Sequence, residues 1–107
     1  MTPPQMQPRE LSQRIASGDP PTVVDVRTGI EFRRGHIPGA LHVPTWKLLL
    51  GLAPLPSDRQ TELVVTCELG PRAMIVKALL GLIGYRKVVL LAGHMAGWRR
   101  SRLPQDR

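Results

Sequence analysis

Three short apolar segments, each followed by a segment of helical character, restrict this chain to very few architectures. The segments TVVDV (22–26), TELVVTC (61–67) and KVVLLAG (87–93) are rich in β-branched residues or leucine and lie between turn-forming residues, so each is predicted to be a strand. The second and third are almost continuously apolar, as strands are when both faces of their sheet are covered. The alternation predicts an α/β fold with a parallel sheet, in which functional groups gather at the carboxyl ends of the strands.

The segments between these strands supply the predicted helices. A short helix is expected over 7–19, and one or two helical turns over 28–35. The proline and glycine spacing of 36–44 allows only turns and a very short strand. The longest helix is expected over 72–85, and a terminal helix over 94–102.

For two apolar segments, the sequence pattern does not by itself show which side chains are buried. The helix over 72–85 is apolar nearly all round, so we expect it to be covered on several sides. Its expected core residues are Met74, Ile75, Ala78, Leu79 and Leu82. The segment 45–56 begins as a helix and then becomes a loop, which either packs against the core or forms an apolar lip that a partner could contact. Trp98 is expected to anchor the last helix.

Length and charge narrow the class of protein. With 107 residues, the chain is predicted to form a single domain over 1–107. Its net charge of +7 raises the question of nucleic-acid binding, but the basic residues are scattered apart from the cluster WRRSR at 98–102. The four aromatic residues predict no stacking platform for a nucleic-acid strand. A small anionic substrate accounts for the same excess of positive charge.

Several classes of site and location are disfavoured by what the sequence contains. The longest apolar runs, at 48–55 and 78–85, are too short to cross a bilayer, and the first ten residues lack the apolar stretch of a signal peptide. We therefore expect a cytoplasmic protein without a membrane partner, although a domain cut from a membrane-tethered chain would look the same. A single cysteine and three isolated histidines provide no disulfide framework and no zinc motif, so neither a metal nor a cofactor is expected.

The loop TCELGPRA (66–73) places the chain's single cysteine between a predicted strand and a predicted helix. The first N–H groups of a helix lack intrahelical partners, and a loop folded over them can direct several N–H groups at one anion. A thiolate of Cys67 would be stabilised there, whereas a free cysteine has a pKa of about 8.5. Gly70 permits a positive φ or a close approach, while Pro71 offers no N–H. A lone cysteine is otherwise a small buried hydrophobe, but this context favours a reactive thiol.

Arg72 bears on the same interpretation. A cation in the first turn of a helix opposes the helix dipole by about 0.3–1 kcal/mol. That cost is easier to understand if Arg72 holds an anion together with the loop amides. An arginine side chain directed into water would cost almost nothing, so this alternative stays open.

Three longer segments carry the pattern of a known family. The segment VVDVRTGIEFRRGHIPGALHVP (23–44) contains Asp-Val-Arg, a glutamate four residues after the arginine, and then Gly-His-Ile-Pro-Gly-Ala. The segments VVTCELGPRA (64–73) and VVLLAGHMAGW (88–98) match an active-site loop and a last strand with its helix. Together they resemble the rhodanese-like domains over roughly residues 8–104. The resemblance implies a three-layer α/β domain with a central five-stranded parallel sheet and helices on both faces.

The resemblance also implies a chemistry. Sulfurtransferases of this family move a sulfane sulfur from a donor such as thiosulfate or a persulfide to a nucleophilic acceptor. The acceptor is cyanide in vitro, or a thiol or a sulfur-carrier protein, and the sulfur is held in between as a cysteine persulfide. By position, Cys67 is the catalytic nucleophile. The loop amides that are candidates to bind the persulfide are those of Glu68, Leu69, Gly70, Arg72 and Ala73.

The remaining signature positions are expected to be structural. Asp25, Arg27 and Glu31 match charged positions of the first signature, and we expect them to form one hydrogen-bonded cluster that braces a strand–helix junction. His36, in the Gly-His-Ile-Pro-Gly-Ala segment, is expected to be a packed, hydrogen-bonded histidine rather than a base. His42 is expected to flank a short strand.

Two positions depart from the family pattern. Many thiosulfate-using relatives have a basic residue directly after the cysteine, where this chain has Glu68. A carboxylate within about 5 Å of the thiol would repel thiosulfate and raise the pKa of the thiol, whereas a carboxylate that points outward would face a cationic or protein partner. His94 replaces a glycine after the third strand. It is expected either to line the mouth of the Cys67 pocket and pair with the thiolate or to be a surface turn residue.

The sequence therefore predicts a sulfurtransferase and leaves two alternatives. The main alternative is a non-catalytic rhodanese-like module that carries or senses sulfur for a partner protein, which Glu68 and Pro71 favour. The other is a phosphatase-type relative. The loop from Cys67 to Arg72 spans six residues, which suits a sulfur atom, while related phosphatases have one residue more. Pro71 also removes a donor that a phosphate would need.

Overall fold

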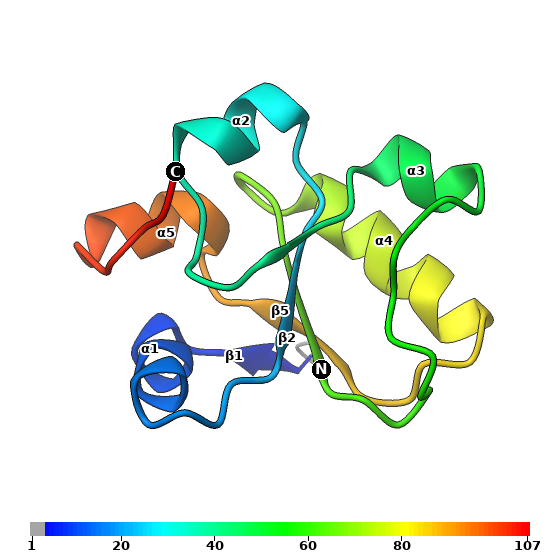
Figure 1. The fold of residues 1–107 in the computed structure, drawn as a ribbon, viewed down its shortest axis with the longest axis horizontal. Coiled ribbons are helices and arrows are strands. Elements are labelled where there is room, and N and C mark those ends of the chain that lie inside the picture. Colours follow the sequence, from blue (N-terminus) through cyan, green and yellow to red (C-terminus); the bar gives the residue numbers. More distant parts are fainter. Residues whose placement is uncertain (1–3) are drawn as a thin grey trace.

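The computed structural model describes residues 4–107, and it shows a five-stranded parallel sheet (Figure 1). The strands lie in the order β1-β5-β4-β2-β3, and all four neighbouring pairs are parallel. Their bounds are β1 (Gln5–Met6), β2 (Thr22–Asp25), β3 (Leu41–His42), β4 (Leu63–Thr66) and β5 (Val88–Leu91). The α/β class and the five-stranded parallel sheet are thereby confirmed.

Helices cover both faces of this sheet. Their bounds are α1 (Pro8–Ala16), α2 (Gly29–Arg34), α3 (Thr45–Leu49), α4 (Pro71–Leu82) and α5 (His94–Arg100). In Figure 1, α1 and α5 lie on one side of the strands, α3 and α4 lie on the other, and α2 lies beyond the carboxyl end of β2. The three-layer arrangement matches the prediction, because strands that are apolar on both faces need cover on both.

Successive side chains of a strand point to opposite faces of the sheet, so the core consists of two clusters, one on each face. Val24 and Val65, which are paired in register, belong to the cluster on the α4 side. Val23 and Val64, the neighbouring pair, belong to the cluster that includes Leu11 of α1 and Trp98 of α5. Trp98 is 1% exposed, which confirms its expected anchoring role. The same alternation places the residue that follows β4 on the α4 side.

Local differences from the predicted elements have simple causes. The first helix ends at Ala16 rather than near residue 19, and the longest helix covers Pro71–Leu82 rather than 72–85. The strand β1 was not predicted, because two residues carry no periodic pattern. It forms only because Gln5 and Met6 pair with Leu90 and Leu91 of β5.

The prediction for the core side of α4 was wrong. Met74, Ile75 and Leu82 are 57%, 56% and 82% exposed, and the buried residues of this helix are Ala73, Val76 and Leu80. The sheet covers one side of α4, and the short α3 contacts only part of the rest. Because the helix is apolar nearly all round, its sequence does not show which side the sheet covers.

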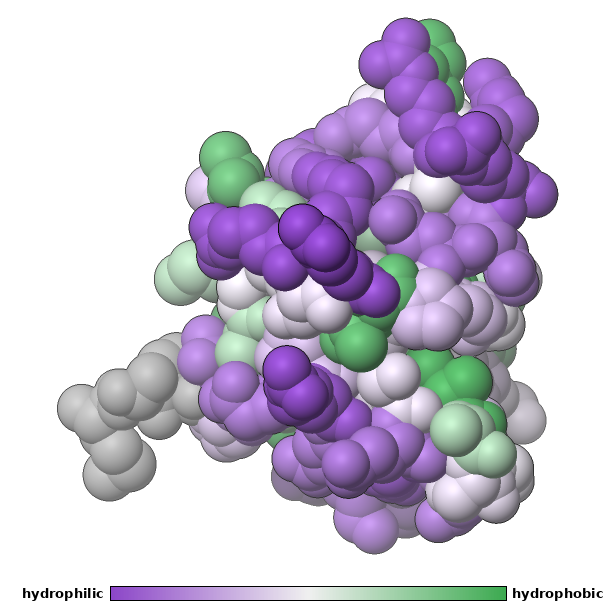
Figure 2. Space-filling view, turned by 90° about the vertical axis from the view of Figure 1, so that its left-hand side faces the viewer, coloured by the Kyte–Doolittle hydropathy of each residue, from purple (hydrophilic) through white to green (hydrophobic). Residues whose placement is uncertain are grey.

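The segment 45–56 combines both expected placements. Leu48, Ala53 and Leu55 pack against the core, while Trp46 and Leu50 are more than half exposed. The opposite side of the molecule, which bears α1, α5 and the C-terminal segment, is covered mainly by hydrophilic side chains (Figure 2). None of the helices within residues 4–107 has the length and apolar character needed to cross a membrane.

Candidate active site

Cys67 lies directly after β4, at the carboxyl end of the sheet, and is completely buried. It continues the alternation of Leu63 and Val65, so its side chain belongs to the core cluster on the α4 side. The N–H of Gly70 donates a hydrogen bond to Cys67 Sγ at 3.0 Å. The carbonyl of Cys67 accepts a hydrogen bond from the N–H of Met95 at 3.0 Å, which ties the loop to α5.

The loop supplies fewer donors to sulfur than the sequence predicted. Among residues 4–107, Gly70 is the residue whose N–H bonds to Sγ, and the amides of the other four candidates, Glu68, Leu69, Arg72 and Ala73, make no such bond. Gly70 caps α4 with φ +132°, a conformation that favours glycine, so its predicted freedom is used. Because α4 begins at Pro71 immediately afterwards and Cys67 points into the core, the remaining amides are not directed at the sulfur.

The predicted position of His94 beside the cysteine is found, but its contact is different. His94 begins α5 with φ +53°, and its ring is buried. Its Nδ1 lies 3.3 Å from the backbone N of Cys67 and accepts that N–H, so the neutral ring carries its proton on Nε2. Burial lowers the pKa of His94, which favours the neutral form. The ring therefore bonds to the main chain of Cys67 rather than to the thiol.

Gly70 of the loop packs closely against the ring of His94. A Cβ built on Gly70 would lie 3.2 Å from His94 Nε2. The ring thus occupies the space that any side chain at position 70 would need. Gly70 is required here for its φ and for this close approach, and both residues contact Cys67.

The Arg72 side chain is bound by a carboxylate of α2, a contact that neither of the two placements considered for it included. Its guanidinium binds Glu31 through two contacts, Nη1–Oε1 at 2.7 Å and Nη2–Oε2 at 3.1 Å. Glu31 also forms a capping box with Thr28 at the start of α2. The bond from Arg72, with a smaller contribution from Thr28, lowers the pKa of Glu31 to about 2, and the same carboxylate raises the pKa of Arg72. Arg72 thus joins α4 to α2.

The expected cluster of Asp25, Arg27 and Glu31 is in fact two separate pairs. Asp25 and Arg27 are both buried, and Arg27 donates from Nε and Nη2 to the two carboxylate oxygens at 3.0 and 2.9 Å. Arg27 Nη2 also donates to the carbonyl of Gly35 at 2.7 Å, which braces the end of α2. Glu31 does not belong to this pair, because its place in the first turn of α2 directs it to Thr28 and to α4.

The histidines of the first signature are held by the main chain. His36 Nδ1 lies 2.8 Å from the carbonyl oxygen of Phe32, and its ring stacks on Phe32 with a centroid distance of 3.8 Å. His42 Nε2 lies 2.8 Å from the carbonyl oxygen of Arg27. Residues 4–107 contain no group of three or more His, Cys, Asp or Glu side chains placed to hold a metal ion.

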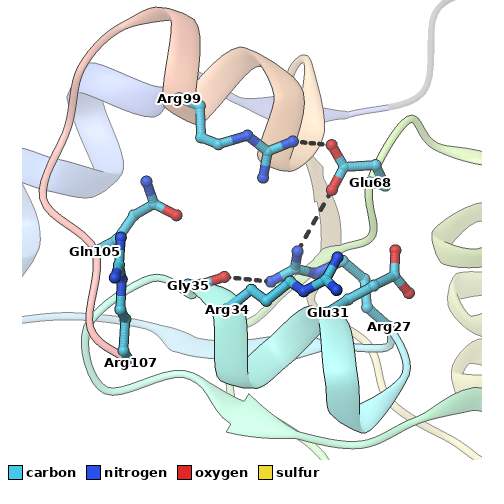
Figure 3. Close-up of a pocket in the computed structure, with 8 residues that line it drawn as sticks. All are labelled: Arg27, Glu31, Arg34, Gly35, Glu68, Arg99, Gln105 and Arg107. Atoms are coloured by element: carbon cyan, nitrogen blue, oxygen red, sulfur yellow. Dashed lines mark hydrogen bonds and ion pairs between the residues drawn. The ribbon is translucent and has the colours of Figure 1, made fainter.

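Glu68 lies between two arginines on the wall of a pocket (Figure 3). Its carboxylate lies 3.4 Å from Arg27 Nη1 and pairs with Arg99 of α5. The pocket beside it has a volume of about 440 Å³. It is lined by Arg27, Glu31, Arg34, Gly35, Glu68, Arg99, Gln105 and Arg107. Sequence reasoning noted the basic cluster at 98–102 but did not connect it with the loop.

The family model of the rhodanese-like domain matches residues 7–101. The chain belongs to the rhodanese-like family. The Sulfurtransferase of Allochromatium vinosum is 36% identical over 94 residues, which cover 88% of this chain and 86% of that protein.

A thiosulfate sulfurtransferase and a rhodanese-like domain of known structure are also similar to this chain. The Thiosulfate sulfurtransferase GlpE of Haemophilus influenzae is 32% identical over 84 residues, and the match covers 78% of each chain. The solution structure of the rhodanese-like domain of the Alr3790 protein from Anabaena sp. is similar with a TM-score of 0.83 at 26% identity. That match covers 98% of this chain and 80% of the other. The rhodanese-like fold is thereby shown for nearly the whole chain.

Proposed function

We propose that this chain is a sulfurtransferase that carries a sulfane sulfur as a persulfide on Cys67. The observation that carries the proposal is the 3.0 Å hydrogen bond from the Gly70 N–H to Cys67 Sγ, at the carboxyl end of a parallel strand and next to the start of α4. An N–H at this place can donate to the sulfur of a thiolate or a persulfide. The names of the two curated relatives support the same reaction class.

The transfer consists of two displacements at sulfur. The thiolate of Cys67 attacks the outer sulfur of the donor, a new S–S bond forms, and the bond between the outer sulfur and the rest of the donor breaks. The rest of the donor leaves with the electron pair, as sulfite from thiosulfate or as a thiolate from a persulfide. An acceptor nucleophile then attacks the terminal sulfur and releases the Cys67 thiolate. No external oxidant or reductant is required.

Access to the sulfur requires movement of the loop, because Cys67 is completely buried. Leu69, at the outside of the loop, is 76% exposed, and glycine at position 70 has access to more backbone conformations than any other residue. We propose that the loop between Cys67 and Pro71 opens to admit the donor and closes over the persulfide. The bond between Cys67 N–H and His94 Nδ1 keeps the base of the loop in place.

We propose thiosulfate or a small persulfide as the donor, and cyanide in vitro or a thiol or sulfur-carrier protein as the acceptor. Glu68 was expected to repel thiosulfate if its charge stood alone beside the thiol. Its carboxylate is instead paired with Arg27 and Arg99, which offset that charge. The Haemophilus influenzae relative is named as a thiosulfate sulfurtransferase, which supports the same donor.

The test is intact-protein mass spectrometry after incubation with thiosulfate or with a small persulfide, combined with a thiosulfate:cyanide assay. We expect a mass gain of one sulfur atom that a reductant reverses, and turnover of cyanide to thiocyanate. Cys67→Ser is the matched control and should show neither. If wild type and Cys67→Ser give the same mass and the same background rate with every donor, the proposal is wrong.

The non-catalytic carrier module is the second candidate, and the complete burial of Cys67 is the observation that favours it. A buried sulfur suits storage, because a closed loop slows both loading and release. Under this alternative, mass spectrometry would show the added sulfur, while transfer to cyanide would stay at the rate of the Cys67→Ser control. The two experiments together therefore separate the enzyme from the carrier.

A further inference from the structure

An arginine-rich pocket lies beside the Cys67 loop and includes Glu68, whose pairing with Arg27 and Arg99 offsets its charge in the proposed reaction. It opens between α2, α5 and the C-terminal segment, and its lining residues do not include Cys67 (Figure 3). Its volume of about 440 Å³ is within the range of small-ligand sites. The question is which ligand its charges would attract.

Part of the charge that faces this pocket is compensated within the protein. Arg27 is held by the buried carboxylate of Asp25, and Glu31 is held by Arg72 through two contacts. These two ion pairs form fixed walls, because all four side chains are engaged in hydrogen bonds. Neither pair contributes a net charge to the pocket.

The uncompensated charge is positive. Arg34 on α2 and Arg107 in the C-terminal segment both line the pocket, and within residues 4–107 neither side chain makes an ion pair. Arg99 on α5 faces them and is paired with Glu68 alone. Three guanidinium groups thus line the pocket together with the Glu68 carboxylate, which Arg27 also contacts.

The two sides of the pocket are held in place by backbone hydrogen bonds. His36 and Asp106 form an antiparallel bridge, in which each backbone N–H donates to the carbonyl of the other at 2.9 Å. This bridge fixes the C-terminal segment against the end of α2 and positions Gln105 and Arg107 at the pocket. Arg99 is positioned separately by the helix α5. The main chain therefore brings all three arginines to the same pocket.

We propose that this pocket binds a small multivalent oxyanion of the phosphate or carboxylate class, and that this anion competes with Glu68 for Arg99. A guanidinium group presents paired N–H donors that match the oxygens of a phosphate or a carboxylate. Arg34 and Arg107 supply free donors, and Arg99 becomes available when the anion replaces the Glu68 carboxylate. Glu68 opposes the ligand, because it adds a negative charge to the same wall.

The test is isothermal titration calorimetry of the full chain with pyrophosphate and, separately, with citrate, at neutral pH and with ionic strength held constant by sodium chloride. We expect saturable binding of at least one of the two, and the tighter one identifies the class of oxyanion. Arg34→Gln should weaken binding by about fivefold, and Arg33→Gln, which makes the same charge change on the same helix outside the pocket, should stay within about twofold. Glu68→Gln should tighten binding by about fivefold.

Melting curves from circular dichroism establish that each variant is folded, and Arg107→Gln replaces Arg34→Gln if the latter is not. The site is refuted if neither anion binds, or if Arg33→Gln and Arg34→Gln lose the same affinity, since that result means diffuse attraction by net charge. Competition is refuted if Glu68→Gln binds no more tightly than wild type. Because no step depends on Cys67, these results are independent of the test for sulfur transfer.

Discussion

Replacement of Glu31 by glutamine isolates the ion pair that joins α2 to α4. Glutamine retains the length of the side chain and is compatible with the capping box at Thr28. It removes the negative charge that Arg72 binds through contacts of 2.7 and 3.1 Å. The substitution therefore removes the ion pair and leaves the helix cap in place.

The size of the effect follows from the pKa of this carboxyl group. The hydrogen bonds from Arg72 hold the pKa of Glu31 at about 2, against an ordinary value of 4.5. That difference corresponds to about 3 kcal/mol of preference for the ionised group in the folded protein. The Arg72 and Glu31 side chains are 39% and 31% exposed, and water screens such a pair. We therefore expect Glu31→Gln to lower the free energy of unfolding by about 1–2 kcal/mol at pH 7.

The assay is urea unfolding of wild type and Glu31→Gln at pH 7 and pH 3.5. A pKa that is lower in the folded state contributes stability above about pH 4.5, and this contribution is lost as the pH falls from 4.5 towards 2. The difference between the two proteins should therefore be smaller at pH 3.5. Glu62→Gln, which removes a single 2.9 Å contact with Arg14, is the control and should stay within about 0.5 kcal/mol at both pH values. An equal stability of wild type and Glu31→Gln at pH 7, or a difference independent of pH, would refute the reasoning.

Two further predictions concern His94 and Gly70, which both form hydrogen bonds with Cys67. Because burial lowers the pKa of His94 below its value in the unfolded chain, wild type should lose stability as the pH falls below about 6.5, and His94→Gln should lose less, which thermal unfolding at pH 7.5 and 5.5 measures. A steeper loss in His94→Gln would contradict this. Gly70→Ala should destabilise the protein by about 1–3 kcal/mol, because position 70 has φ +132° and a Cβ there would lie 3.2 Å from the His94 ring. Gly81→Ala, in α4 with open space around its Cα, should instead be neutral or slightly stabilising in the same urea titration; similar losses in both variants would show that the loop imposes no strain.

Much of the fold was predictable because its central strands carry their own signal. The segments at 22–26, 61–67 and 87–93 contain β2, β4 and β5, because short apolar runs rich in β-branched residues and bounded by turn-forming residues fit a buried strand. The strands β1 and β3 have two residues each and exist only through pairing with a neighbour. The exposed side of α4 was likewise decided by the sheet and not by the helix, which is apolar nearly all round.

The candidate site also combines features that the sequence predicts with features that only the fold decides. The sequence by itself determined the position of Cys67 after a strand, a loop in which Gly70 can take a positive φ, and a helix that follows this loop, because these depend on neighbouring residues in the chain. Only the tertiary structure decided that Arg72 binds Glu31, 41 residues away, and that Glu68 meets Arg27 and Arg99. Charged side chains of the same sign are interchangeable in a sequence pattern. Which of them meet depends on how distant segments pack, and therefore on the whole fold.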